Sequence, residues 1–274
     1  MNKVGLSCCG FALNEENFRK LQKSGVSAIE ISMAPDQYKN IRYGEVQAYA
    51  KQYSTELWSF HLPFMPFREI DISSCRKELR DNAVRLYKEL IEKAADIGIR
   101  TFVIHPSGEP IGPEEREDRI RYSMQTLDSL AEFAHQYGAV IAVENLPRTC
   151  LGNTADEMLR LISANDKLRV CFDTNHLLQG SHADFIQKLG DKIVTLHVSD
   201  YDFVDEKHWL PGEGKIDWPA LYSALKESGY SGAWLYELGL KAPGSRPRSR
   251  DLTFEDFRQN ADAIFAGKQP ARVL

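Results

Sequence analysis

Histidine and acidic residues recur at the ends of short apolar segments along this 274-residue chain. Six segments end in such a residue: His61, His105, Glu144, Asp173, His197 and Glu237. His176 follows shortly after the fourth of these, and Glu206 and His208 lie in a polar stretch further along. Carboxylates and imidazoles bind divalent cations and exchange protons with substrates. The pattern therefore predicts metal-assisted or acid–base chemistry, provided that the fold brings these residues together.

The acidic members of this set would be costly to bury side by side. Glu144, Asp173 and Glu237 together carry three negative charges, which need protons or a cation nearby. One histidine or glutamate at a strand end is commonly structural or solvated, but six in succession favour a shared site. Carboxylate oxygens mixed with imidazole nitrogens suit Mn, Co, Mg or Zn. By contrast, His135 and His182 fall within expected helices, and we expect surface or structural roles for both.

The segments that end in these residues are typical of buried parallel strands, because they are almost continuously apolar. We expect eight strands, at Val4–Cys8, Ala28–Ser32, Leu57–His61, Thr101–His105, Val140–Glu144, Val170–Asp173, Ile193–His197 and Trp234–Glu237. Helical patterns alternate with them, at Asn14–Lys23, Lys77–Ile97, Pro113–Tyr137, Asp217–Gly229 and Phe254–Phe265. A further helix begins at Thr154, where Glu157 three residues later predicts a capping box.

Eight strands alternating with helices predict a single-domain (β/α)8 TIM barrel over residues 1–274. An open doubly wound sheet is the structural alternative. It usually carries a glycine-rich phosphate loop after its first strand, and the sequence Cys8-Cys9-Gly10-Phe11 is not such a loop. In a parallel barrel every strand ends at the same face, so the histidine and acidic residues should converge at one mouth.

Composition limits the class of partner. The formal net charge is −5, and no basic run stands out apart from Arg246, Arg248 and Arg250, so a nucleic-acid partner is disfavoured. Five cysteines without CxxC spacing do not form a disulfide framework. We find neither a signal peptide nor an apolar run long enough to span a membrane, so we expect a cytoplasmic protein with no membrane partner. A homo-oligomer stays open.

Several motifs, in chain order, resemble the xylose-isomerase-like barrel superfamily, and more narrowly its sugar phosphate isomerase/epimerase group. They are VIHPSG, VENLPR, FDTNH, HVSDYD and LPGEGKIDW. The resemblance spans essentially the whole chain, and its most specific part is HVSDYD followed by HWLPGEGKIDW. It implies an isomerase or epimerase of carbohydrate metabolism that acts on a sugar or sugar derivative through an enediolate.

The resemblance to ketose 3-epimerases also implies roles for individual residues. In that family two Glu, one Asp and one His hold one metal, often manganese, and the matching positions are Glu144, Asp173, His197 and Glu237. We expect one divalent cation here, Mn first, with Zn, Co or Mg as alternatives. The two Glu would also be the catalytic acid/base pair, and a histidine matching His176 would contact substrate. Those epimerases carry an Arg where this chain has Phe203.

The same superfamily contains endonuclease IV, which holds three zinc ions with nine ligands. All nine have counterparts here, with Glu206 standing where that family has an Asp, so Glu206 and His208 are candidate ligands of an additional metal. Metal-dependent phosphodiester hydrolysis is therefore an alternative function. A polyol dehydratase or lyase, and a barrel without catalytic activity, are further alternatives.

The remaining expectations concern substrate contacts. His61, His105 and His208 are expected to contact substrate, or to bind a second cation. Trp209 lies in an expected loop and could pack against a sugar ring. The loop that contains Arg246, Arg248 and Arg250 follows the last strand, where barrels often bind phosphate, so it could bind an anionic substrate or else be exposed and mobile.

Overall fold

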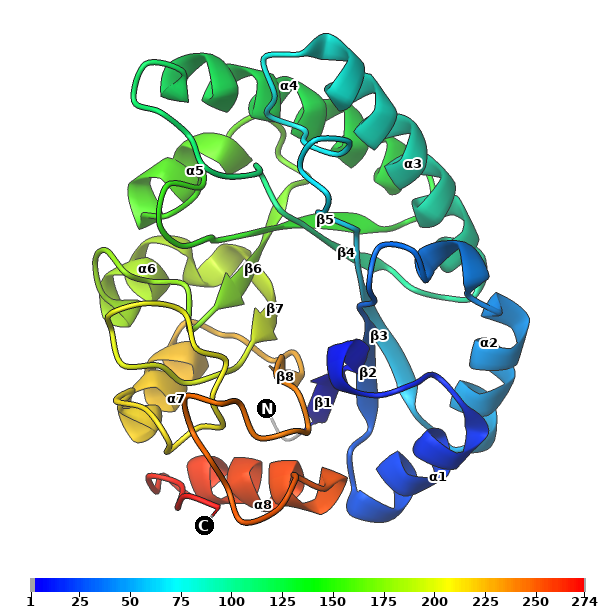
Figure 1. The fold of residues 1–274 in the computed structure, drawn as a ribbon, viewed down its shortest axis with the longest axis vertical. Coiled ribbons are helices and arrows are strands. Elements are labelled where there is room, and N and C mark those ends of the chain that lie inside the picture. Colours follow the sequence, from blue (N-terminus) through cyan, green and yellow to red (C-terminus); the bar gives the residue numbers. More distant parts are fainter. Residues whose placement is uncertain (1–2, 274) are drawn as a thin grey trace.

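The computed structural model describes residues 3–273 and contains eight parallel strands surrounded by eight α-helices (Figure 1). The strands are β1 (Val4–Ser7), β2 (Ala28–Ile31), β3 (Glu56–His61), β4 (Thr101–Ile104), β5 (Val140–Glu144), β6 (Arg169–Asp173), β7 (Ile193–His197) and β8 (Trp234–Tyr236). The helices are α1 (Glu15–Ser24), α2 (Tyr43–Gln52), α3 (Lys77–Asp96), α4 (Arg116–His135), α5 (Ala155–Ile162), α6 (His182–Leu189), α7 (Trp218–Glu227) and α8 (Phe254–Phe265). The predicted TIM barrel is confirmed.

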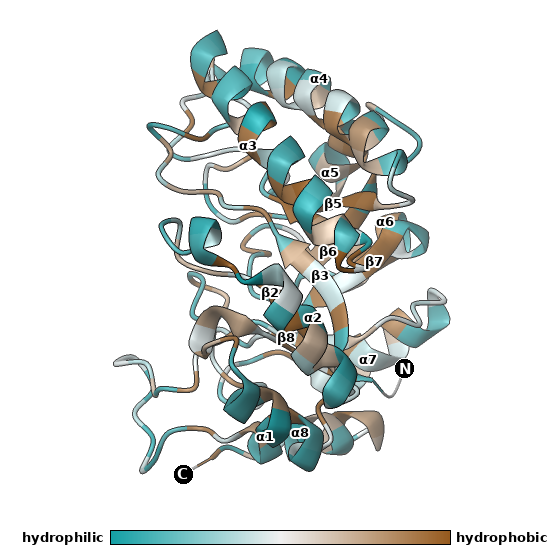
Figure 2. Ribbon diagram, turned by 90° about the vertical axis from the view of Figure 1, so that its right-hand side faces the viewer, coloured by the Kyte–Doolittle hydropathy of each residue, from teal (hydrophilic) through white to brown (hydrophobic). Residues whose placement is uncertain are grey.

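The strands are paired in sequence order, with β1 also paired to β8. An isolated parallel bridge between Val198 and Tyr236 joins β7 to β8 and completes the ring. All eight expected strands are present, with ends within one residue of those expected. In Figure 2 the strands and the inward helix faces are brown and the outer helix faces are largely teal, as burial between the barrel and its helices requires.

Side-chain alternation within the strands divides the core into two parts. One set of strand residues packs outward against the helices and forms the large apolar core. The other set points into the barrel, where Val103, Ala142 and Cys171 form a small apolar cluster. Because side chains alternate along a strand, Glu144 and Asp173 lie on the same inner face as Ala142 and Cys171, two residues nearer the mouth.

Local capping explains most helix starts. The side chains of Asn14 and Asp217 accept hydrogen bonds from backbone N–H groups in the first turns of α1 and α7. The capping box predicted at α5 is only half correct. Thr154 accepts from the Glu157 N–H at 3.3 Å, but the Glu157 carboxylate instead accepts from Gly152 N and from Arg116. Among residues 3–273, no helix is long and apolar enough to cross a membrane.

Candidate active site and metal centre

Four side chains meet at the mouth, the end of the barrel at which the strands terminate. Glu144 ends β5, Asp173 ends β6, His197 ends β7 and Glu237 directly follows β8. One ligand atom from each lies within 4.8 Å of the others, and we call these four residues the ligand group. Asp173 and His197 are register partners on adjacent strands, so the sheet itself places them side by side. The predicted convergence therefore occurs.

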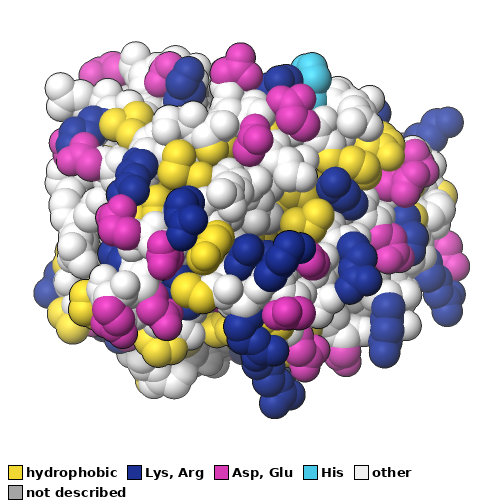
Figure 3. All heavy atoms as spheres, turned by 90° about the horizontal axis from the view of Figure 1, so that it is seen from above, with side chains coloured by type: hydrophobic (Ala, Val, Ile, Leu, Met, Phe, Trp, Pro, Cys, Tyr) yellow, Lys and Arg dark blue, Asp and Glu magenta, His cyan; other side chains and the backbone are white. Residues whose placement is uncertain are grey.

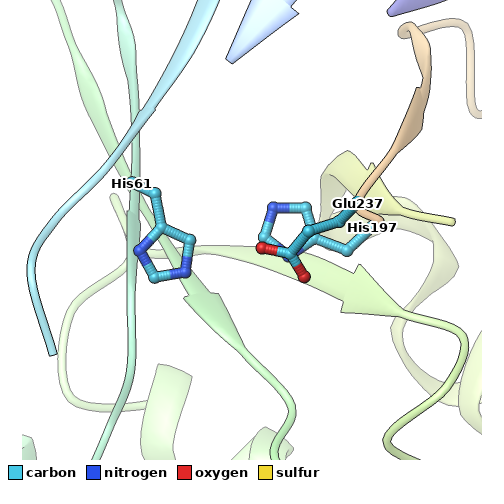
Figure 4. A group of neighbouring side chains, drawn as sticks. All are labelled: His61, His197 and Glu237. Carbon is cyan, nitrogen blue, oxygen red and sulfur yellow. The ribbon is translucent and has the colours of Figure 1, made fainter. Parts of the chain in front are cut away.

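The Glu144 carboxylate lies at the centre of three imidazoles. Its Oε1 is 3.0 Å from His197 Nδ1, and its Oε2 is 3.2 Å from His61 Nε2 and 3.1 Å from His105 Nε2. Burial opposes ionisation, but His197 and His105 outweigh it and hold the pKa of Glu144 well below its usual range. Figure 4 shows the Glu237 carboxylate beside the His197 ring, with His61 on the opposite side.

Asp173 provides the test of whether a cation fits. Its Oδ1 accepts a hydrogen bond from Asn175 N at 2.6 Å, whereas its Oδ2 is buried without a hydrogen-bond partner among the described residues. Burial raises the pKa of Asp173 to about 6; the positive charge of His176 opposes this shift, while the negative charges of Glu144 and Glu237 add to it. Asp173 Oδ2 has no hydrogen bond, and it lies beside two glutamates and an imidazole. Together these oxygen and nitrogen donors suit one divalent cation, which would also satisfy Oδ2.

Glu30 is a functional residue that the sequence reasoning missed. It is buried on β2, and its two carboxylate oxygens lie 3.0 and 3.1 Å from His197 Nε2, while Ser59 Oγ donates to it at 2.8 Å. When His197 donates its Nε2–H to Glu30, its Nδ1 is left to face the other three residues of the ligand group. The available signal was a charged residue inside the otherwise apolar strand Ala28–Ile31.

Two further groups of ligand-type side chains flank the ligand group. His61, His105 and Glu144 bring three ligand atoms within 4.8 Å of one another. The same holds for His176, Glu206 and His208, which we call the flanking group. Although burial opposes both shifts, the surrounding carboxylates raise the pKa of His176 to about 10, and His176 with Arg148 lowers the pKa of Glu206 to about 2.

A cavity of about 590 Å³ opens above these residues. Both glutamates of the ligand group line it, whereas Asp173 and His197 are not part of the described lining. The four histidines that the sequence predicts to contact substrate also line the cavity, namely His61, His105, His176 and His208. Part of its lining is apolar and includes Phe64, whose ring stacks on His105 at 4.1 Å between centroids.

The predicted substrate contact at Trp209 is not supported by its position. Trp209 is buried and is not among the described residues that line the cavity. It pairs with Asp200 in an isolated antiparallel bridge, donates its indole N–H to Ser245 at 3.0 Å and lies beneath the guanidinium of Arg246. Its loop therefore directs the ring into the packing beneath the loop that follows β8.

Two of the three arginines in the loop after β8 are already paired with carboxylates. Arg248 is buried and forms a two-point ion pair with Glu213, with both N–O distances 2.7 Å. Arg250 pairs with Asp256 in the same way, at 2.7 and 2.8 Å. These carboxylates neutralise two of the three guanidiniums, whereas Arg246 lies over the Trp209 ring. Phe203, where ketose 3-epimerases carry an Arg, is exposed and packs on Tyr201 and His182.

Residues 18–253 match the family described as the xylose isomerase-like TIM barrel. The chain belongs to this family. It is 24% identical over 241 residues to the D-psicose 3-epimerase of Enterocloster bolteae, a match that covers 83% of this chain and 77% of that enzyme. It is 29% identical over 188 residues to the inosose isomerase of Bacillus subtilis, covering 64% of each chain.

Solved structures share the fold. An L-ribulose 3-epimerase superposes with a TM-score of 0.80 at 19% identity, covering 97% of this chain and 94% of that one. At this identity the similarity establishes the barrel architecture, and the chemistry has to be argued from the side chains at the mouth.

Proposed function

We propose that this protein is a divalent-metal-dependent isomerase or epimerase that acts on a sugar or sugar derivative. The observation that carries the proposal is the ligand group, in which four side chains at the ends of four strands converge and one buried carboxylate oxygen of Asp173 lacks a hydrogen-bond partner. The names of the relatives, a ketose 3-epimerase and an inosose isomerase, support the same class of reaction. Manganese is the cation we propose first.

The positions of the two glutamates support a role in proton transfer. Glu144 and Glu237 both line the cavity and come from strands that are not neighbours in the ring. We assign them as the acid/base pair, one taking the proton from the carbon beside a substrate carbonyl and the other returning it. Return to the same carbon on the opposite face gives epimerisation, whereas return to the neighbouring carbon, with a proton moved between the oxygens, gives isomerisation.

The remaining residues hold this arrangement in place. A divalent cation held by the ligand group would supply positive charge beside the substrate carbonyl and so lower the cost of removing the adjacent proton. Glu30 fixes the orientation of His197, while His61 and His105 hold the Glu144 carboxylate. The apolar part of the lining, around Phe64, would limit water near the reacting carbons.

The test is deuterium exchange into candidate substrates. The metal-loaded protein is incubated in D2O with a panel of ketoses and inososes, and NMR follows incorporation at the carbon beside the carbonyl. We expect exchange and a new epimer or isomer with at least one compound, and loss of both in Glu144→Gln and Glu237→Gln. A dehydrated product would indicate a lyase instead. Exchange that survives both substitutions would contradict the assignment.

Metal-dependent phosphodiester hydrolysis is a second candidate, which the two additional groups of ligand atoms favour. Together with the ligand group they would bind three ions, as in endonuclease IV. Against it, the formal net charge is −5. Figure 3 views the molecule from the side on which α3 and α4 lie in Figure 1, and acidic and basic side chains are interspersed on that side. Incision of abasic-site DNA by the purified protein, with three zinc ions per chain, would replace the isomerase proposal.

A further inference from the structure

Arg148 connects three loops at the mouth of the barrel. It follows β5, lines the cavity and has a positive φ of 52°, which is uncommon for a residue with a side chain. Its guanidinium donates to both carboxylate oxygens of Glu109, at 3.1 and 2.5 Å, and to Asp205 at 3.1 Å. The side chain is thus held in one place by carboxylates from the loops after β4 and β7.

The same guanidinium contacts the carboxylate of the flanking group. Arg148 Nη1 lies 2.8 Å from Glu206 Oε1, while the other oxygen of Glu206 lies 3.2 Å from His176 Nε2. Without Arg148, the flanking group would offer two imidazoles and a carboxylate within 4.8 Å of one another, which is a complete set of protein ligands for a divalent ion.

We propose that Arg148 prevents the flanking group from holding a cation and so limits this site to one metal ion, an inference that rests on the proposed function. A guanidinium stays protonated at any working pH, so a second cation on Glu206 would have to share its carboxylate with a fixed positive charge. Repulsion between like charges weakens binding at such short range. Arg148 is thus a positioning residue that favours one-metal carbonyl chemistry over three-metal phosphodiester chemistry.

A purely structural role for Arg148 makes a different prediction. If the arginine served only to tie the loops together, replacing it would lower stability without changing the number of ions bound. Arg116 offers a matched control, because it forms a comparable two-point ion pair with Glu157, at 2.9 and 2.7 Å, and is not part of the described cavity lining. Its removal should leave the metal content unchanged.

The experiment measures zinc per chain in the full-length protein. Metal-stripped protein is dialysed to equilibrium against Zn2+, the bound metal is measured by mass spectrometry, and calorimetry gives the affinity of each site. We expect one ion in the wild type, in Arg148→Lys and in Arg116→Met. We expect two in Arg148→Met, with second-site affinity at least tenfold above the wild type, and one again when His208→Ala is added to Arg148→Met.

Several outcomes separate this inference from the proposed function. One ion in both the wild type and Arg148→Met overturns the role of Arg148 and leaves the one-metal site intact. More than one ion in the wild type also overturns it. A wild type that binds no ion refutes the proposed function, and the inference with it. Arg148→Gln is measured in parallel, so that a folded variant with a neutral side chain decides the outcome if Arg148→Met fails to fold.

Discussion

Asp173 and Asp200 are two fully buried aspartates that follow neighbouring strands, yet their surroundings differ. Asp200 Oδ1 accepts hydrogen bonds from the backbone N–H groups of Tyr201 and Ile216, and its Oδ2 accepts from Gly212 N and from the indole of Trp218, at 2.8 to 3.2 Å. Asp173 Oδ1 accepts one hydrogen bond from Asn175, and its Oδ2 accepts none within residues 3–273, its nearest imidazole nitrogen being His176 Nδ1 at 3.6 Å. The first carboxylate is fully satisfied by its own loop, and the second is not.

This difference separates a carboxylate that builds structure from one placed to bind a ligand. The loop around Asp200 is the LPGEGKIDW motif, and it closes so tightly that a Cβ on Gly214 would lie 2.2 Å from Asp200 Oδ1. Gly212 adopts a φ of +94°, which favours glycine. The LPGEGKIDW motif therefore shapes a loop, whereas Glu144, Asp173 and His197 of the ligand group come from the motifs VENLPR, FDTNH and HVSDYD.

The largest expected effect comes from removing a charge of the ligand group. Glu144→Gln should lower turnover by about 10²- to 10⁴-fold, because it removes a proton-transfer group as well as a metal ligand. Steady-state kinetics and metal analysis measure both losses. Glu213→Gln serves as the control for loss of charge, because it removes a buried carboxylate outside the described cavity lining. If the control lost as much turnover as Glu144→Gln, the special role of the ligand-group carboxylates would be contradicted.

Asp200→Ala should behave in the opposite way. It leaves four buried donors unsatisfied, so the free energy of unfolding should fall by about 3–5 kcal/mol. The protein that remains folded should still bind its cation. Urea denaturation with metal analysis of the folded fraction gives both quantities, and unchanged stability would show that the loop does not depend on this carboxylate.

The pH dependence of the metal-free protein tests Asp173 directly. Its folded pKa of about 6 lies above the ordinary aspartate pKa of 3.8, so the folded state holds this proton more tightly than the unfolded state. Stability from this group is therefore present below pH 4 and is lost as the pH rises through 6, by about 3 kcal/mol at most. We expect Asp173→Asn to remove that loss in urea titrations between pH 4 and 7. An unchanged slope would contradict the raised pKa.

The smallest effect is expected at Trp209. Because its ring packs under the loop after β8, Trp209→Phe should change KM and kcat by less than about twofold while lowering stability modestly. A thermal melt and substrate saturation curves give these values. A tenfold rise in KM with unchanged stability would restore the substrate contact that the sequence suggested.

The ligand group could be predicted because parallel strands end at one face, so the position of each strand end determines where its last side chain lies. Glu30 was not predicted as part of the site because it lies inside a strand, where only the side-chain alternation of the closed barrel shows that its charge points inward. The directions of the Trp209 and Arg248 side chains could not be predicted, because they depend on the partners Ser245 and Glu213, each more than 30 residues away. Glu157 likewise has a partner distant in the chain, because it pairs with Arg116 of α4 instead of completing the capping box of α5.

Anomalous diffraction from crystals soaked in Mn2+ tests the central claim most directly. The account predicts one strong peak, about 2–2.5 Å from ligand atoms of Glu144, Asp173, His197 and Glu237, with Asp173 Oδ2 among them. The absence of a peak between these four side chains, or peaks of equal strength at the flanking group, would contradict it.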